Sequence, residues 1–285
     1  MLEQSFLLLT GIGVKTERRL WSAGVHCWDD LLARGERFFA PGTMVRLVTE
    51  IDACRQALAA GDAVFFERLL PPGQHWRLFP HFRPRTGYLD IETTGDAANQ
   101  VTTVAVFDGA AVSWYVRGRN LDQLAAELAG YDVLVTFNGR RFDVPVLRAQ
   151  LGLALPQAQI DLVSVLRALG LKGGLKACER SLGLDRGPLD GLDGYAAVLL
   201  WQEFQRSGCR AALDTLLAYN IEDTVNLEAL LVEAYNRHRA ATPLVTCPPM
   251  PAPGQPLRPI LPDPSTVARL KARLAARRTA GPPPW

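Results

Sequence analysis

Residues 88–95 read Tyr88-Leu89-Asp90-Ile91-Glu92-Thr93-Thr94-Gly95, an apolar strand pattern that carries two carboxylates two positions apart. Successive side chains of a strand point to opposite faces, so Asp90 and Glu92 share one face while Leu89 and Ile91 point into the core. Two like charges on one side of a mostly buried strand are unfavourable unless a cation compensates them, and a divalent metal ion is the simplest such cation. The pattern therefore predicts a strand that supplies half of a metal site.

The composition is that of an ordinary soluble globular protein, with 48% hydrophobic and 21% charged residues in a chain of 285. A net charge of +2 excludes a polybasic nucleic-acid binder but is compatible with local basic patches. The five cysteines are an odd number without a C-x-x-C pair, which argues against a disulfide framework or a zinc site and for a reducing compartment. No apolar run reaches the roughly 18 residues of a membrane span, and residues 6–9 are too few for a signal peptide. We expect a cytoplasmic protein without a membrane partner.

Residues 1–70 are predicted to form a small helical region that is interrupted by a glycine turn. The turn has the sequence Leu9-Thr10-Gly11-Ile12-Gly13-Val14, and a helix is expected after it over residues 15–23. This run resembles a helix-hairpin-helix motif, whose backbone N–H groups receive a nucleic-acid phosphate without reading its sequence. Gly11, Gly13 and Lys15 are therefore candidate substrate-binding residues. The alternative is a tight helical hairpin that only packs.

A further amphipathic helix is predicted over residues 44–60 of this region. Its expected core face consists of Met44, Leu47, Val48, Ile51 and Leu58.

Residues 71–85, which are rich in proline and arginine, are predicted to connect this region to the main domain at residues 86–240. Strand patterns then occur at residues 88–93, 101–107, 112–116 and 133–135. Helical patterns occur at residues 121–128, from 143, and at 162–169, 175–182, 195–204 and 211–238. The order of three strands, a helix, a strand and a helix is typical of the ribonuclease H-like fold. We therefore expect an α/β protein with a mixed sheet flanked by helices.

Residues 241–285 are predicted to form an extended, proline-rich C-terminal tail, because nine prolines occur between Pro243 and Pro264. Ser265 is expected to cap a short basic segment over residues 267–278. This segment either lies on an acidic or phosphate surface or is a solvated end.

Two more carboxylates need the same explanation as Asp90 and Glu92. Asp143 follows the fourth strand at the start of a helix, and Asp223 lies on an otherwise apolar face of the long helix. Each alone has a plain structural explanation, since Asp143 could cap its helix and Asp223 could pair with an arginine. Together, and in this order, the four acids indicate chemistry.

Three motifs in this order resemble those of the DEDD superfamily of 3′-5′ exonucleases, and within it the YprB-like ribonuclease H-like domain family. The resemblance covers residues 86–235. The motifs are Leu89-Asp90-Ile91-Glu92-Thr93-Thr94-Gly95, Phe137-Asn138-Gly139-Arg140-Arg141-Phe142-Asp143-Val144-Pro145 and Tyr219-Asn220-Ile221-Glu222-Asp223. Residues 160–162 and 175–184 look like the family's intervening pattern. Tyr219 precedes Asp223 by four residues, which is typical of the tyrosine subclass and puts both side chains on one helix face.

The resemblance implies a metal-dependent 3′-5′ exonuclease that hydrolyses phosphodiester bonds at single-stranded nucleic acid ends with two Mg²⁺ or Mn²⁺ ions. It implies that Asp90, Glu92 and Asp223 hold one ion, that Asp90 bridges to the second, and that Asp143 completes the acid set directly or through water. Tyr219 would orient the attacking water, because a phenol with an ordinary pKa near 10 is not a free base at neutral pH.

Further substrate-binding candidates are Thr93 of the first motif and three residues on the loop before Asp143, namely Asn138, Arg140 and Arg141. Solvated surface arginines are the plainer reading of the last two. Asp161 is explained by helix capping, and Glu222 points about 100° away from Asp223, so we expect it to be exposed.

Two other functions stay open at this point: a non-catalytic nucleic-acid-binding scaffold, and a structure-specific endonuclease. The presence of all four acids and Tyr219 argues against the scaffold. The choice between DNA and RNA is not decided, because no residue can be assigned to the 2′-hydroxyl.

Overall fold

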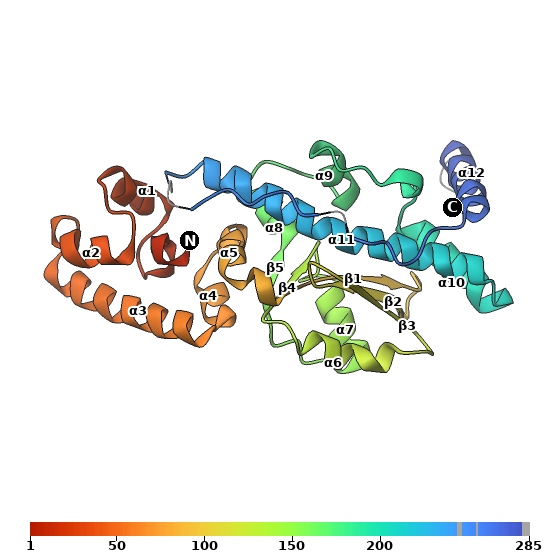
Figure 1. The fold of residues 1–285 in the computed structure, drawn as a ribbon, viewed down its shortest axis with the longest axis horizontal. Helices are drawn as coiled ribbons and strands as arrows, with labels where there is room; N and C mark the ends of the chain where they lie inside the picture. The colour runs from red at the N-terminus through yellow and green to blue at the C-terminus, as the bar shows by residue number, and fades with distance from the viewer. Residues whose placement is uncertain (244–246, 255, 281–285) are drawn as a thin grey trace.

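Strand β1 (Thr86–Thr93), which carries Asp90 and Glu92, is the central strand of a mixed five-stranded sheet in the computed structural model (Figure 1). The strand order is β3-β2-β1-β4-β5; β2 is antiparallel to β1 and β3, whereas β1, β4 and β5 are parallel. The other strands are β2 (Val101–Phe107), β3 (Val112–Val116), β4 (Val133–Thr136) and β5 (Ala158–Asp161). The predicted mixed sheet flanked by helices is confirmed.

The edge strand β5 was not predicted. Its sequence Ala158-Gln159-Ile160-Asp161 has one β-branched residue and lacks the apolar run that marks the equally short β4. Its pairing with β4, in which Val135 lies opposite Ile160, places Asp161 beside the end of β4.

The structure describes residues 1–243, 247–254 and 256–280. None of the helices in these ranges is both long and apolar enough to cross a membrane.

The two faces of β1 pack against different helices, as the alternation of its side chains requires. Leu89 and Ile91 belong to a core with α6 (Leu124–Leu128) and α7 (Asp143–Leu151). Tyr88, on the other face, shares a core with residues of the long helix α11 (Arg210–Ala240). Asp90 and Glu92 therefore face α11, which runs along the sheet (Figure 1).

Three helices precede α11 and complete this layer, and side-chain caps fix where two of them begin. Asp161 accepts a hydrogen bond from the Val163 amide (3.0 Å) and Asp193 accepts one from the Ala196 amide (3.1 Å). These helices are α8 (Leu162–Arg167), α9 (Leu175–Ser181) and α10 (Gly194–Ser207).

The N-terminal region is helical, but the segment before the glycine turn consists of two 3₁₀ turns, Leu2–Gln4 and Phe6–Leu8. The helix expected over residues 44–60 begins earlier, because Pro41 starts it at a position where a missing N–H costs nothing. Val48 is 40% exposed and does not belong to its core face. The region contains α1 (Val14–Ser22), α2 (Trp28–Arg34), α3 (Pro41–Ala60) and α4 (Ala63–Leu69). The connection after it contains the 3₁₀ segment Pro72–Arg77 and α5 (Phe79–Phe82).

A buried ion pair ties this region to the connection that follows it. The Arg77 guanidinium donates to both carboxylate oxygens of Glu17 at 2.8 Å, and also to Ser5 Oγ at 2.6 Å. Glu17 in turn accepts hydrogen bonds from the amides of Phe6 (2.8 Å) and Leu7 (3.1 Å). Glu17 and Arg77 are 0% and 3% exposed, so each depends on the other for its charge.

The C-terminal segment runs back along α11 without helix or strand over its described residues 247–254 and 256–263 (Figure 1). Asn236 of α11 exchanges two hydrogen bonds with the backbone of Met250 (2.8 and 2.9 Å). Helix α12 (Pro264–Ala280) follows and packs Val267, Leu270 and Leu274 against the core of α10 and α11. Asp263, rather than the expected Ser265, caps it by accepting from the Thr266 amide (2.8 Å).

We expect Arg77→Met to lower the free energy of unfolding by about 3–5 kcal/mol, because Glu17 would be left buried without its cation. Urea unfolding followed by circular dichroism measures this. The double variant Arg77→Met/Glu17→Gln should recover part of the loss. Arg55→Met is the control, since Arg55 pairs with Asp29 at the surface. An equal effect of the two arginine substitutions would contradict the role given to the buried pair.

Candidate active site

Three of the predicted acids come together between β1 and α11. Asp90, Glu92 and Asp223 each offer a carboxylate oxygen, and these oxygens all lie within 4.8 Å of one another. The strand supplies two of them from one face, and the apolar packing of α11 supplies the third. Asp90 and Glu92 keep part of their surface open to solvent, whereas Asp223 is buried.

The crowding of these acids raises the pKa values of the two strand carboxyls. For Asp90, removal from water raises the pKa most, and the neighbouring charges of Asp223, Glu92 and Asp143 raise it further. For Glu92, burial and Asp223 raise the pKa, while the nearby cations of Lys176 and Arg186 partly oppose them. The metal-free cluster therefore favours bound protons or a bound cation.

Asp143 begins α7 and is buried at the edge of this cluster. Its charge acts on both Asp90 and Glu92, but it lies outside the group of three oxygens within 4.8 Å. Burial raises the pKa of Asp143 to about 7, against hydrogen bonding from its own backbone and that of Ile91, which lowers it.

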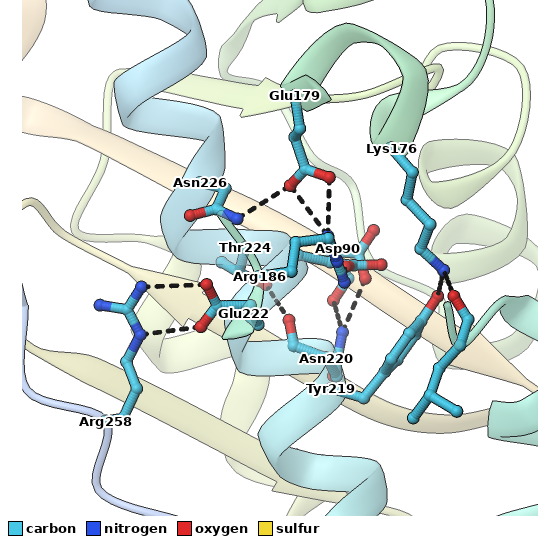
Figure 2. A network of polar contacts seen from close by, with 12 residues as sticks. Asp90, Lys176, Glu179, Arg186, Tyr219, Asn220, Glu222, Thr224, Asn226 and Arg258 are labelled. Carbon is cyan, nitrogen blue, oxygen red and sulfur yellow. Dashed lines mark hydrogen bonds and ion pairs between the residues drawn. The ribbon is translucent and has the colours of Figure 1, made fainter. Parts of the chain in front are cut away.

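Asn220 holds Asp90 in place, a role that was not predicted although the residue lies inside the third motif. Its Nδ2 group donates to Asp90 Oδ2 at 2.7 Å and to the Asp90 carbonyl at 3.2 Å (Figure 2). One carboxylate oxygen of Asp90 is thus engaged by the protein, and Oδ1 remains for a cation.

Lys176 of α9 contacts the phenol of Tyr219, the predicted partner of Asp223. The Lys176 ammonium donates to Tyr219 Oη and to the Leu192 carbonyl, and it lies 4.5 Å from the centre of the tyrosine ring (Figure 2). Burial raises the pKa of Tyr219, as do the charges of Asp223 and Glu92. Tyr219 is therefore a neutral phenol at physiological pH, in line with a role in orientation.

Arg186 lies in the segment between α9 and α10 and reaches into the acid cluster. Its Nη1 atom donates to both oxygens of Glu179 at 2.8 Å (Figure 2). Its Nη2 atom pairs with Asp223 Oδ1. Asn226 also donates to Glu179, at 2.8 Å. Glu179 and Arg186 were not predicted, because their partners are distant in sequence and no periodicity marks them.

The loop before Asp143 is held by Asp161. The Asp161 carboxylate accepts hydrogen bonds from the backbone amides of Asn138 (2.9 Å) and Arg140 (3.4 Å), in addition to capping α8. The Arg140 side chain pairs with Glu67 of α4, and Arg141 is exposed. Thr93 donates to Asn99 at 2.7 Å and is buried.

The glycine turn is not brought to this site. Helix α1, which follows Gly11 and Gly13 and includes Lys15, lies at one end of the elongated molecule, away from the sheet (Figure 1). Gly11 adopts a φ of +83°, which only glycine adopts without strain. The turn packs on α3, where the Thr10 amide donates to Glu50 at 2.8 Å.

Glu222 is buried, so the expectation that it would be exposed is wrong. The C-terminal segment covers this face of α11, and Arg258 binds both oxygens of Glu222 at 2.8 and 3.2 Å (Figure 2). A helical angle alone could not predict this, because the covering chain comes from beyond the domain.

The donor set fits a divalent cation. Carboxylate oxygens are the ligands that Mg²⁺ and Mn²⁺ prefer, and no histidine or cysteine belongs to this cluster among the described residues. The three acids also lie where a cation would relieve their mutual repulsion. Asp223 already pairs with a protein cation, Arg186.

The family of the chain follows from comparison with known proteins. The profile of the RNase H superfamily matches residues 87–235, just over half of the chain. The chain belongs to the RNase H superfamily. Its matched range contains the sheet and all four predicted acids, which confirms the RNase H-like fold.

No curated protein matches this RNase H superfamily member. Among solved structures it is similar to the family B DNA polymerase from the hyperthermophilic archaeon Pyrobaculum calidifontis, with 18% sequence identity and a TM-score of 0.40. That match covers 53% of this chain and 25% of the polymerase, so the chain spans about a quarter of the polymerase's length.

We expect Glu92→Gln to raise the free energy of unfolding in EDTA by about 1 kcal/mol, because it removes one of the crowded charges without changing side-chain size. Chemical unfolding of the EDTA-treated protein measures this. Glu222→Gln is the control. Because Glu222 pairs with Arg258, this variant should not be more stable than wild type. A Glu92→Gln protein that is less stable than wild type in EDTA would show that the acids are not mutually repulsive.

Proposed function

We propose that the protein is a metal-dependent 3′-5′ exonuclease that hydrolyses phosphodiester bonds at single-stranded nucleic acid ends. Membership of the RNase H superfamily and the buried acidic cluster indicate a nuclease. The observation that carries the finer proposal is the meeting of Asp90, Glu92 and Asp223 with Tyr219 one helical turn before Asp223. With Asp143 at the edge of the cluster, these residues make up the set that the DEDD tyrosine-type resemblance requires.

The proposed ligands are Asp90, Glu92 and Asp223, with Asp143 at the edge of the cluster. When bound, divalent Mg²⁺ or Mn²⁺ ions would activate water for attack on phosphorus and stabilise the leaving 3′ oxygen. The Oδ2 atom of Asp90 accepts a hydrogen bond from Asn220, and its carboxylate would be one of the oxygen ligands. These carboxylates gain a partner for charges that the fold otherwise crowds together.

Tyr219 is proposed to orient the attacking water through its own proton. An ammonium group has no lone pair, so Tyr219 Oη must be the acceptor in its hydrogen bond with Lys176. The phenolic O–H is therefore left to donate to another oxygen. Burial raises the pKa of Tyr219, so the phenol carries this proton in the metal-free protein.

The proposed contacts for the terminal nucleotide are Asn138, Arg140, Arg141 and Thr93. A phosphate farther along the nucleic acid strand is proposed to contact Gly11, Gly13 and Lys15. The separation of the glycine turn from the acids supports a role with a longer substrate rather than with the scissile bond (Figure 1).

We expect 5′-labelled single-stranded DNA or RNA to shorten stepwise from its 3′ end in Mg²⁺ or Mn²⁺, and Asp90→Ala to abolish the ladder. Gel electrophoresis of the products measures this. The control is Glu222→Gln, which changes a carboxylate next to Asp223 that faces Arg258, and which should retain activity. Equal nicking of circular substrates would favour an endonuclease, and tight binding without cleavage would favour a scaffold; either result contradicts the proposal.

Tyr219→Phe should lower kcat by roughly 100-fold with little change in KM, because it removes the proton that orients the water while leaving the ring in place. Steady-state kinetics on a labelled oligonucleotide separate the two constants. An unchanged kcat would remove the role given to the phenol.

A further inference from the structure

One buried arginine stands between the acids and the cation that they are proposed to hold. Arg186 is 5% exposed, and its guanidinium links Glu179 on one side with Asp223 on the other. Its charge also acts on Glu92, so it lies within the field of the whole cluster. A divalent ion bound by the same acids would meet this positive charge at close range.

The contacts of Arg186 are unequal. The two bonds to Glu179 both leave from Nη1, whereas Nη2 alone holds Asp223, so the guanidinium can release Asp223 and stay anchored. The Arg186 Nε atom is buried and has no hydrogen-bond partner. An unsatisfied buried donor carries a free-energy cost, which favours a second arrangement of this side chain.

Arg186 and Glu179 each have an anchor that does not depend on Asp223. Arg186 immediately precedes the 3₁₀ turn Gly187–Leu189 between α9 and α10, and its carbonyl accepts a hydrogen bond from the Leu189 amide at 3.2 Å. Glu179 lies on α9 and accepts a hydrogen bond from Asn226 of α11 at 2.8 Å, so its position does not depend on the bond between Arg186 and Asp223.

We propose that Arg186 is a built-in cation that occupies Asp223 in the metal-free protein and must leave it when a divalent metal binds. This inference rests on the proposed metal site. The pair neutralises part of the acid cluster while no metal is bound, and Glu179 retains the guanidinium after Asp223 has been released. Arg186 thus sets the apparent metal affinity of the site without being a ligand.

The competing arrangement is one in which Arg186 stays on Asp223 Oδ1 and orients the carboxylate for the ion, as hydrogen-bonded metal ligands commonly are oriented. The two arrangements predict opposite signs. A competitor weakens metal binding, so its removal strengthens binding; an orienting partner strengthens metal binding, so its removal weakens it.

The test is the affinity of the EDTA-treated, full-length protein for Mn²⁺ alone, measured by isothermal titration calorimetry and by the electron paramagnetic resonance signal of free Mn²⁺. We expect Arg186→Gln to bind Mn²⁺ about tenfold more tightly than wild type. This is the change expected if Arg186 leaves Asp223 free for the metal in about one-tenth of the wild-type molecules and in all molecules of the variant. Arg258→Gln is the matched control, because it removes the arginine from the carboxylate one residue before Asp223 and should leave the affinity unchanged.

Arg186→Gln leaves Glu179 without its cation, so the double variant Arg186→Gln/Glu179→Gln is measured beside it and decides the result if the single variant does not fold. Tighter Mn²⁺ binding by either folded variant supports the proposal. Weaker or equal binding overturns it, and weaker binding assigns Arg186 the orienting role. Wild-type binding that Asp90→Asn does not reduce would instead overturn the metal site itself, and the proposed function with it.

Discussion

The repulsion between carboxylates on one face of the central strand is the constraint to which the rest of the site responds. Asp90 and Glu92 cannot turn to the opposite face, because the alternation of the strand gives that face to Leu89 and Ile91. Asp223 approaches the same space from α11 because the helix is held against the sheet by its apolar neighbours. Like charges so placed require protons or cations, and this requirement links the fold to its chemistry.

The protein supplies some of that compensation from its own side chains. Asn220 fixes one oxygen of Asp90, Lys176 and Arg186 bring positive charge to Glu92 and Asp223, and Glu179 holds Arg186 in turn (Figure 2). Each of these residues comes from α9, α11 or the segment that follows α9. The layer on one side of the sheet therefore positions the acids, while α6 and α7 on the other side form the apolar support (Figure 1).

The sheet and the acids could be predicted because their signals are local. Runs of β-branched and aromatic residues marked β1 to β3, and the acids on apolar elements stood out as charges without partners. The strand β5 was missed because only Ile160 of its four residues is β-branched, whereas the equally short β4 contains the apolar run Val133-Leu134-Val135. Arg186, Glu179 and the burial of Glu222 depend on contacts between residues 7 to 47 positions apart. No spacing rule reaches such contacts, because they arise from how segments cross in space.

The contacts of the C-terminal segment could not be predicted from its sequence either. Its prolines correctly exclude a helix over the described residues before Pro264, but they do not indicate that it lies along α11 and pairs Arg258 with Glu222. Its last helix also buries Val267, Leu270 and Leu274, so this part is packed rather than solvated. The composition of a segment indicates which secondary structure it cannot form. The residues that it contacts depend on the surface against which it packs.

The most direct measurement is the anomalous diffraction of Mn²⁺ in crystals of the protein grown with and without the ion. We expect an anomalous peak among the carboxylate oxygens of Asp90, Glu92 and Asp223, with the Arg186 guanidinium withdrawn from Asp223 but still bound to Glu179. Crystals saturated with Mn²⁺ that show no peak at these carboxylates, with Arg186 still on Asp223, would contradict the assignment of this cluster as a metal site.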